Sequence, residues 1–186
     1  MILLVGLGNP TPDSNDNRHN VGFKIIDAIN QKFGLSKQKP KFKGLLTTGN
    51  IANKKIYAIK PLTFMNNSGI CIRELMEYFK IDIDDVIVFH DDLDVDFGKI
   101  KAKFGGSSAG HNGIESIDKF IGKEYSRVRV GIGKPDKKIP VSEYVLNNFN
   151  EEEKIQLGQI TMNIIESIPI LIDKKLDLFS STVNNK

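Results

Sequence analysis

Short apolar runs alternate with amphipathic runs along most of this chain, and that alternation limits the folds it can adopt. The hydrophobic pattern predicts strands at 2–7, 44–51, 55–60, 85–90, 99–104 and 127–132. It predicts helices at 21–33, 68–80, 112–121 and in a long C-terminal segment. The runs ILLV and VIVF are short and apolar enough to be central strands covered on both faces. The alternation therefore predicts an α/β architecture built in layers.

The C-terminal segment predicts a long amphipathic helix. Apolar residues recur there every three or four positions, at Leu157, Ile160, Ile164, Ile168 and Leu171. Pro169 lies among them and favours a kink, because proline cannot donate the backbone hydrogen bond of a helix. We expect this helix to pack on the sheet rather than to contact a membrane.

One domain accounts for the whole chain. A domain of 186 residues buries about 70% of the surface of its unfolded chain, and no repeat or linker divides residues 1–186. The apolar run after Met1 is too short to span a membrane and lacks the flank and cleavage site of a secretory signal. Cys71 is the only cysteine, so we expect no disulfide within the chain and no chemistry from this thiol. We expect a soluble, cytoplasmic, monomeric protein.

Basic residues are concentrated in two parts of the chain. No Asp or Glu occurs from Ala28 to Arg73, where eight lysines lie. Further along, Lys99, Lys101 and Lys103 alternate, so a strand would place their three ammonium groups on one face. This distribution suits a surface that binds phosphates. A lysine-rich surface that is only exposed to solvent explains it equally well.

Polar side chains gather after four of the predicted strands. In α/β sheets the ligand crevice lies beyond the carboxyl ends of the strands, so these segments are candidates for a site. They supply histidines, amides and a carboxylate: His19, His90, His111, Asp91, Asn9, Asn66 and Asn112. Each asparagine taken alone also fits a turn or a helix cap.

Two familiar motifs fail in these segments. GLG at residues 6–8 begins like a dinucleotide fingerprint, but Thr11 takes the third glycine position and no helix starts there. The aspartates of DLDVD have calcium-loop spacing, but Lys103 stands where a bidentate glutamate is required. The sequence therefore gives no dinucleotide site and no calcium loop.

Ser108 is a candidate nucleophile. It lies in GSSAG, which matches the G-x-S-x-G turn of esterases between a predicted strand and a predicted helix. That fold needs a histidine well after the serine, whereas the last histidine here is His111, three residues later. The order His19, Asp91, Ser108 still permits a convergent triad, so a serine esterase remains an alternative.

A histidine paired with a carboxylate needs no protein nucleophile. Neutral histidine can deprotonate water at cytoplasmic pH if a partner fixes its tautomer and stabilises the imidazolium that forms. Asp91 follows a predicted buried strand and is a candidate for that partner. The amides of Asn9, Asn66 and Asn112 could donate to an oxyanion and accept from a substrate N–H without adding charge.

Five motifs follow one another through nearly the whole chain: VGLGNP with RHNVGF, KPLTFMNNSG, VIVFHDDLD with FGKIKAKFGG, AGHNGIESI, and RVRVGIGKP. In these motifs the chain resembles the bacterial peptidyl-tRNA hydrolase family. The resemblance implies a single-domain α/β fold with a mixed central sheet flanked by helices. It implies hydrolysis of the ester between peptide and tRNA in peptidyl-tRNA, which frees the tRNA for translation, without a metal or another cofactor.

The resemblance also assigns roles to residues. His19 of RHN would be the general base, Asp91 of HDD the carboxylate that keeps it basic, and Asn9 of GNP a reader of the first peptide bond. Other residues would line the site and contact the tRNA end or the peptide: Phe64, Met65, Asn66 and Asn112. His111 would lie in an adjoining gate loop and His90 would have a supporting role. Basic positions near the tRNA backbone are Lys101, Lys103 and Arg129.

The opening loop and the gate loop depart from the family pattern. Thr11, Ser14 and Asn17 stand where the family usually has glycine, tyrosine and threonine. Ser14 keeps a position expected to contact tRNA but cannot supply an aromatic contact. Ala109 replaces a usual glycine and narrows the backbone freedom of the gate loop.

A non-catalytic RNA-binding protein is the second alternative. It would use the lysines of residues 28–73 and the gate loop, and its binding to tRNA would weaken with salt without any ester cleavage. Binding alone gives no reason for a histidine and an aspartate among amides.

Overall fold

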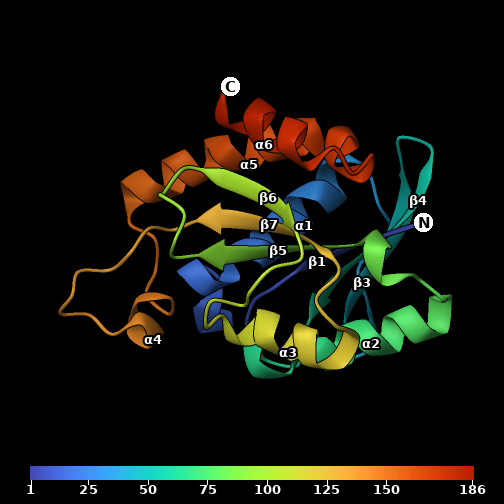
Figure 1. The fold of residues 1–186 in the computed structure, drawn as a ribbon, viewed down its shortest axis with the longest axis horizontal. Coiled ribbons are helices and arrows are strands. Elements are labelled where there is room, and N and C mark those ends of the chain that lie inside the picture. The colour runs from blue at the N-terminus through green and yellow to red at the C-terminus, as the bar shows by residue number, and fades with distance from the viewer.

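A seven-stranded sheet runs through the middle of the molecule in the computed structural model, which describes residues 1–186 (Figure 1). The strand order is β2-β3-β4-β1-β5-β7-β6. The strands are β1 (Ile2–Gly6), β2 (Lys39–Lys41), β3 (Gly44–Ile51), β4 (Lys54–Pro61), β5 (Val86–Asp92), β6 (Ile100–Phe104) and β7 (Ser126–Gly131). The neighbours β4, β1, β5 and β7 are parallel, whereas the pairs β2–β3, β3–β4 and β6–β7 are antiparallel. The predicted mixed sheet is confirmed.

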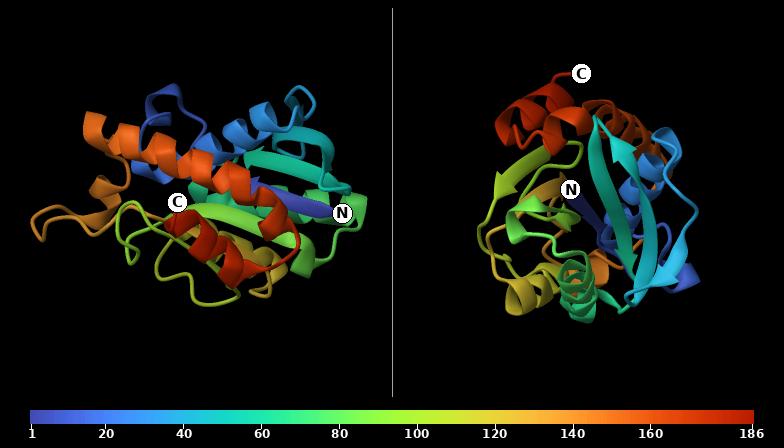
Figure 2. Two further views of the ribbon diagram at one scale, coloured as in Figure 1. Left: turned by 90° about the horizontal axis from the view of Figure 1, so that it is seen from above. Right: turned by 90° about the vertical axis from the view of Figure 1, so that its right-hand side faces the viewer.

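Helices cover both faces of this sheet (Figure 2). They are α1 (Val21–Lys32), α2 (Ser68–Phe79), α3 (Asn112–Ile121), α5 (Glu151–Ile172) and α6 (Leu176–Asn184), whereas the short α4 (Val141–Tyr144) lies to the side of the sheet in Figure 1. Successive side chains of β1 point to opposite faces, so this strand contributes to two cores. Ile2 and Leu4 pack with α1, α5 and α6, while Leu3 and Val5 pack with α2 and α3. The apolar run at the N-terminus is therefore a central strand covered on both sides, as predicted.

The C-terminal segment forms two helices rather than one. α5 continues through Pro169 to Ile172, and α6 follows after a short turn. By length and composition alone α5 could span a membrane, but its residues Leu157, Ile164 and Ile168 are buried in the core with α1 and α6. The predicted packing of this helix in the core is confirmed.

Two elements were not predicted from the sequence. The edge strand β2 has the sequence KPK and is fully exposed, so it shows no apolar alternation. Lysine and proline on an edge strand discourage pairing with another chain. The four residues of α4 are too few for a helical period to be recognised.

The direction of β6 differs from the expectation that its carboxyl end borders the site. β6 is antiparallel to β7, and its last residue Phe104 pairs with Ser126 at the start of β7. Residues 105–111 then return along the molecule to the start of α3 (Figure 1). The buried guanidinium of Arg127 donates to the carbonyl of Ser107 at 3.0 Å and anchors this returning loop.

The free edge of β6 is covered by α6. The side chain of Asn184 accepts from the N–H of Ile100 at 2.9 Å and donates to its carbonyl at 2.8 Å. The hydroxyl of Ser180 accepts from the N–H of Ala102 at 2.8 Å. These side chains satisfy backbone groups that would otherwise be open to another strand.

Candidate active site

The candidate site lies where β1, β4 and β5 end, because the carboxyl ends of parallel strands meet at one edge of the sheet. Asn9 follows β1, Met65 follows β4, and Asp91 lies at the end of β5. Two neighbouring cavities of about 300 Å³ and 440 Å³ open there, and His19 lines both of them.

Asn20 joins the GNP and RHN segments to one another. Its side-chain oxygen accepts from the N–H of Asn9 at 2.8 Å, and its amide donates to the carbonyl of Asn9 at 2.9 Å. Gly22 then lets α1 start against the sheet, since a Cβ at this position would lie 2.5 Å from the carbonyl oxygen of Phe89. These contacts bring His19, ten residues after Asn9, back to the strand ends.

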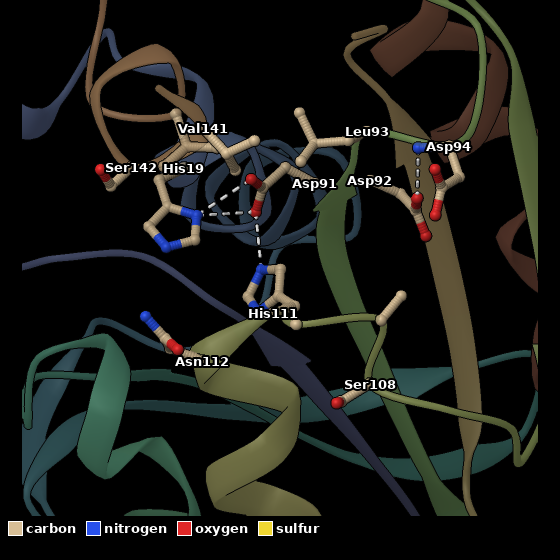
Figure 3. A pocket seen from close by; sticks show the side chains of 13 residues that line it. His19, Asp91, Asp92, Leu93, Asp94, Ser108, His111, Asn112, Val141 and Ser142 are labelled. Atoms are coloured by element: carbon tan, nitrogen blue, oxygen red, sulfur yellow. Dashed lines mark hydrogen bonds and ion pairs between the residues drawn. The ribbon is translucent and has the colours of Figure 1, made fainter. Parts of the chain in front are cut away.

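Asp91 binds two histidines at once (Figure 3). Nδ1 of His19 lies 2.9 Å from Oδ2 and 3.0 Å from Oδ1 of the carboxylate. Nε2 of His111 lies 2.8 Å from Oδ1. Asp91 and His19 are 3% and 8% exposed, so solvent screens these interactions weakly.

The partners of His111 define its tautomer. Its Nδ1 accepts from the backbone N–H groups of Gly113 and Ile114, which caps the start of α3. A nitrogen that accepts carries no proton, so the proton of neutral His111 lies on Nε2 and is donated to Asp91. His111 is therefore the cap of α3 as well as a partner of Asp91, and it is the last residue of the loop before α3.

The pKa of Asp91 lies well below its usual range. Burial by itself would raise this pKa, but the interactions with His111 and His19, which both donate hydrogen bonds to the carboxylate, outweigh it. Asp91 is thus a carboxylate at neutral pH and accepts the Nδ1 proton of His19. This arrangement leaves Nε2 of His19 as the basic nitrogen.

His90 lies behind this cluster as a neutral ring. Its Nδ1 donates to the backbone carbonyl of Asp91 at 2.8 Å, and its ring is 5.1 Å from that of His111. Burial lowers the pKa of His90 to about 4, because a protonated ring would lose its contact with water. His90 lines neither cavity.

Amide side chains line the cavities that His19 borders. Asn112, the first residue of α3, lines both cavities, and Figure 3 shows its amide facing the ring of His19. Asn9 and Asn66 line the larger cavity. Oδ1 of Asn9 already accepts from the N–H of Met65 at 2.9 Å, so its NH₂ group is the part left for a ligand.

Phe64 has a strained backbone at the rim of the larger cavity. Its φ of 62° and ψ of 158° lie in a region that is almost restricted to glycine, which costs about 1–3 kcal/mol. Phe64 as a whole residue is 54% exposed, although its side chain is a large apolar group. The N–H of Met65, the residue after Phe64, donates to Oδ1 of Asn9, and this bond holds the conformation in place.

The segment around α4 forms a wall of the site that sequence patterns did not reveal. Ser142 and Val145 line both cavities, Val141 lines the smaller and Leu146 the larger. The backbone N–H of His19 donates to the carbonyl of Val145 at 2.8 Å. A backbone contact of this kind does not depend on residue type. The residue composition of the KPD…VSEYVL run is therefore the only sequence signal for this part of the site.

Ser108 lacks the partner that a nucleophilic serine needs. It lines the smaller cavity, but its hydroxyl makes no hydrogen bond to any histidine, and Figure 3 shows it apart from His19. His111, the nearest histidine in the sequence, is already engaged by Asp91 and by the backbone of α3. The geometry thus gives the serine esterase alternative no support.

A family model decides which proteins this chain is related to: the model described as peptidyl-tRNA hydrolase matches residues 3–186. The chain belongs to the peptidyl-tRNA hydrolase family. The peptidyl-tRNA hydrolase of Pelagibacter ubique (strain HTCC1062) is 79% identical over 186 residues, which is 100% of both chains. That of Ehrlichia canis (strain Jake) is 44% identical over 98% of this chain and 94% of the relative. The solved structure of peptidyl-tRNA hydrolase from Acinetobacter baumannii matches with a TM-score of 0.92 and 32% identity, over 99% of this chain and 94% of that chain.

As a member of the peptidyl-tRNA hydrolase family, the chain is a carboxylic ester hydrolase and its substrate is peptidyl-tRNA. The alternative that this chain binds RNA without catalysing a reaction is therefore excluded. The family resemblance read from the five sequence motifs is confirmed, and so is the fold that it implied.

The basic residues that peptidyl-tRNA hydrolases are expected to use near tRNA lie at one edge of this sheet. Lys101 and Lys103 are exposed on β6, and Arg129 lies opposite Lys101 on β7. Arg129 donates to Asp92 at 2.7 Å, so part of its charge is neutralised within the chain. Lys99, just before β6, is exposed as well.

The lysines of residues 28–73 do not form one free basic surface in this peptidyl-tRNA hydrolase. Lys60 is buried and lies 2.6 Å from Asp27. Lys43 pairs with Glu74, a residue just beyond the stretch without acids. Carboxylates from other segments therefore neutralise part of the charge that the sequence suggested.

The departures from the family pattern lie around the larger cavity and in the gate loop. Thr11 and Ser14 line that cavity, and their hydroxyl oxygens are 2.6 Å apart. Asn17 is buried and forms an isolated bridge with Asn148. Ala109 has a φ of 47°, a left-handed conformation that glycine would adopt at lower cost.

Proposed function

We propose that His19 is the general base of peptidyl-tRNA hydrolysis and that Asp91 holds it in the reactive tautomer. One observation carries this proposal. Nδ1 of His19 is engaged by Asp91, whereas its Nε2 has no partner within the chain and belongs to the side chain that borders both cavities. A nitrogen in this state can accept a proton from water in the cavity.

The reaction then follows simple proton accounting. Nε2 of His19 takes a proton from water while the water oxygen bonds to the ester carbonyl carbon. When the tetrahedral intermediate collapses, the bond to the ribose oxygen breaks and the imidazolium returns its proton to that oxygen. The products are a tRNA with a free hydroxyl and a peptide carboxylic acid, which becomes a carboxylate by releasing the second proton of the water to solvent. Asp91 stabilises the imidazolium between these steps, as an anion bonded to Nδ1.

Amide donors around His19 would bind the carbonyl groups of the peptide. Asn112 faces His19, which suits the oxygen of the ester as negative charge develops on it. The free NH₂ of Asn9 suits the carbonyl of the first peptide bond. A free aminoacyl-tRNA has no such carbonyl and carries a charged amine, so N-blocked aminoacyl-tRNA would be preferred.

The two cavities would divide the substrate between them. The smaller cavity is lined by Asp94, which also lines a third cavity together with Lys101 and Arg129. This continuity with basic residues favours the smaller cavity for the tRNA end. The larger cavity then receives the peptide, because the apolar side chains of Phe64 and Leu146 lie beside amide side chains there.

We further propose that the mechanism uses no metal. His19, Asp91 and His111 together offer three potential ligand atoms. A metal would need a lone pair on Nε2 of His111, yet the backbone donors at its Nδ1 keep the proton on Nε2. We also propose that the enzyme acts in the cytoplasm as a monomer without contacting a membrane.

Release of N-acetyl-aminoacyl groups from tRNA tests the proposal. We expect His19→Ala to lower the rate about 10³-fold, because general base catalysis contributes about 10²–10⁴. Ser108→Ala should change the rate less than threefold. Turnover by His19→Ala close to that of the wild type would contradict the proposal, and loss confined to Ser108→Ala would restore the serine mechanism.

A further inference from the structure

Arg18 is a buried cation beside the proposed base, and most of its contacts lie in residues 141–149, here called the wall segment. Its guanidinium donates to the backbone carbonyls of Tyr144 and Asn147, each at 3.3 Å. The carbon of the guanidinium lies 4.1 Å from the centre of the Tyr144 ring. One planar cation thus binds two carbonyls and an aromatic ring of the same segment.

Backbone hydrogen bonds continue this attachment on both sides of Arg18. The N–H of Arg18 donates to Asn147 at 3.1 Å, and the N–H of His19 donates to Val145 at 2.8 Å. The N–H of Phe149 donates to Asp16 at 3.1 Å. The position of the wall segment relative to His19 is therefore set by the base itself and by the residues just before it, Asp16 and Arg18.

Glu153 balances the charge of Arg18. Its Oε1 accepts from Arg18 at 3.1 Å and from the N–H of Asn150 at 2.9 Å. Asn150 in turn accepts from the N–H of Glu153 at 2.8 Å, which completes a capping box at the start of α5. The pair links the loop of His19 to a helix that is anchored in the core, and removing one member would leave a charge with little exposure unpaired.

The wall segment matters for the reaction because it borders both cavities next to His19. Ser142 and Val145 line each of them. A displacement of this wall by about 1 Å would misplace the ester relative to Nε2 of His19, which can cost about 10²-fold in rate.

We propose that the ion pair of Arg18 and Glu153 positions the wall segment against His19 and so sets the width of both cavities. Arg18 acts through the wall segment and is a positioning residue. This inference rests on the proposed role of His19 as the base. It assigns to the arginine of RHN and to the first turn of α5 a shared part in the geometry of the site.

Two variants remove the pair from either side, and a third preserves part of it. Arg18→Met removes the charge and the carbonyl contacts, Glu153→Gln removes only the negative charge, and Arg18→Lys keeps a cation without the planar fork. Arg73→Met is the matched control, because it breaks an arginine–glutamate pair with Glu77 on α2 that lines neither cavity. Hydrolysis of N-acetyl-aminoacyl-tRNA is measured where circular dichroism shows each variant folded.

We expect Arg18→Met to lower kcat about 10- to 100-fold and Arg18→Lys and Glu153→Gln to lower it less. The pH at half-maximal kcat/KM should not move, since Asp91 still holds His19. Amide hydrogen exchange at His19 should accelerate at least tenfold in Arg18→Met, because its bond to Val145 opens more often. The control should match the wild type in all three readouts.

Rates and His19 amide exchange within twofold of the wild type in folded Arg18→Lys, Glu153→Gln and Arg18→Met would overturn the inference. A shift of the pH profile by the same variants would also overturn it, because that would mean a direct effect on the base. Amide exchange reports the wall whether or not His19 is the base. Failure of this inference is therefore distinguishable from failure of the mechanism, which His19→Ala tests.

Discussion

Nδ1 of His19 lies 2.9 Å from Oδ2 of Asp91, and this contact joins residues 72 positions apart in the chain. The same carboxylate accepts from Nε2 of His111 at 2.8 Å. The two imidazoles differ in their remaining nitrogen. That of His111 accepts from the backbone of α3, whereas that of His19 has no partner within the chain. One carboxylate therefore orients a ring that supports the site and a ring that is available for chemistry.

His111→Asn should separate the two contacts of His111. Asparagine caps helices well, so the start of α3 should remain stable, but its side chain is too short to reach Asp91. The hydrogen bond from His111 to the charged carboxylate of Asp91 contributes about 1.5–3 kcal/mol to stability, so the melting temperature should fall by about 3–12 °C. Asp91 is then held by His19 alone, and kcat/KM should fall about 10- to 100-fold, because a misplacement of about 1 Å can cost about 10²-fold in rate. A folded variant with unchanged kcat/KM would show that His111 serves α3 alone.

His90 should make the protein less stable as the pH falls from 7 to 5. The unfolded chain binds a proton at His90 near the ordinary pKa of about 6.5, whereas in the folded state the pKa of this histidine is lowered to about 4. The unfolded state binds more protons in that window, so the free energy of unfolding decreases by about 2 kcal/mol. Urea denaturation at pH 7, 6 and 5 measures this slope.

His90→Asn is the comparison for that slope. Its side-chain NH₂ can replace Nδ1 of His90 as donor to the carbonyl of Asp91, and it does not titrate. Its free energy of unfolding should vary less with pH by about 2 kcal/mol over the same range. Parallel slopes for the two proteins would show that His90 is not buried as a neutral ring.

The alternation of short apolar runs with amphipathic runs predicted the layers of the fold. A strand that is buried on both faces, such as β1, is a continuous apolar run and is therefore easy to recognise. Side chains on one face, such as Leu4, meet α1, while those on the other, such as Leu3, meet α2. Alternation carries no information on strand direction, so the antiparallel course of β6 was not foreseen. β2 escaped prediction because an edge strand that is exposed on both faces has no apolar pattern.

The candidate site could be predicted where its groups lie in recognisable motifs. His19, Asp91 and the amides fall into this class. The second bond of Asp91, to His111, could not be predicted, because it depends on how far the loop after β6 returns. The wall segment could not be predicted either, since backbone hydrogen bonds such as that from His19 to Val145 do not depend on residue type.

Replacing Phe64 by glycine should stabilise the protein and weaken its activity. Phe64→Ala serves as the control, because it removes the exposed ring but keeps the strained backbone with its φ of 62°. The strain is worth about 1–3 kcal/mol and the flexibility of glycine costs about 0.5–1 kcal/mol. In urea denaturation, we expect the free energy of unfolding of Phe64→Gly to exceed that of Phe64→Ala by about 1 kcal/mol. Both variants should have a higher KM than the wild type. Equal stability of the two would show that the backbone relaxes around alanine.

Lys101 and Lys103 should account for part of the salt dependence of tRNA binding. Each exposed lysine that neutralises a phosphate contributes about 0.9 to the slope of log Kd against log salt concentration. The double substitution Lys101→Ala, Lys103→Ala should therefore reduce that slope by about 2. The matched control changes Lys41 and Lys55, which are exposed and lie among the lysines of residues 28–73. A larger decrease of the slope in the control would show that tRNA binds to residues 28–73 instead of to β6.

Single-turnover hydrolysis by a set of four proteins tests the pairing of His19 with Asp91 most directly. The set comprises the wild type, His19→Ala, Asp91→Asn and the double variant, all assayed with N-acetyl-aminoacyl-tRNA at pH 7. If Asp91 acts by orienting His19, removing it after His19 is gone has no further cost, because groups that act as a unit are not additive. We predict that the double variant is as slow as His19→Ala within about threefold. Independent penalties that multiply in the double variant would contradict the paired mechanism.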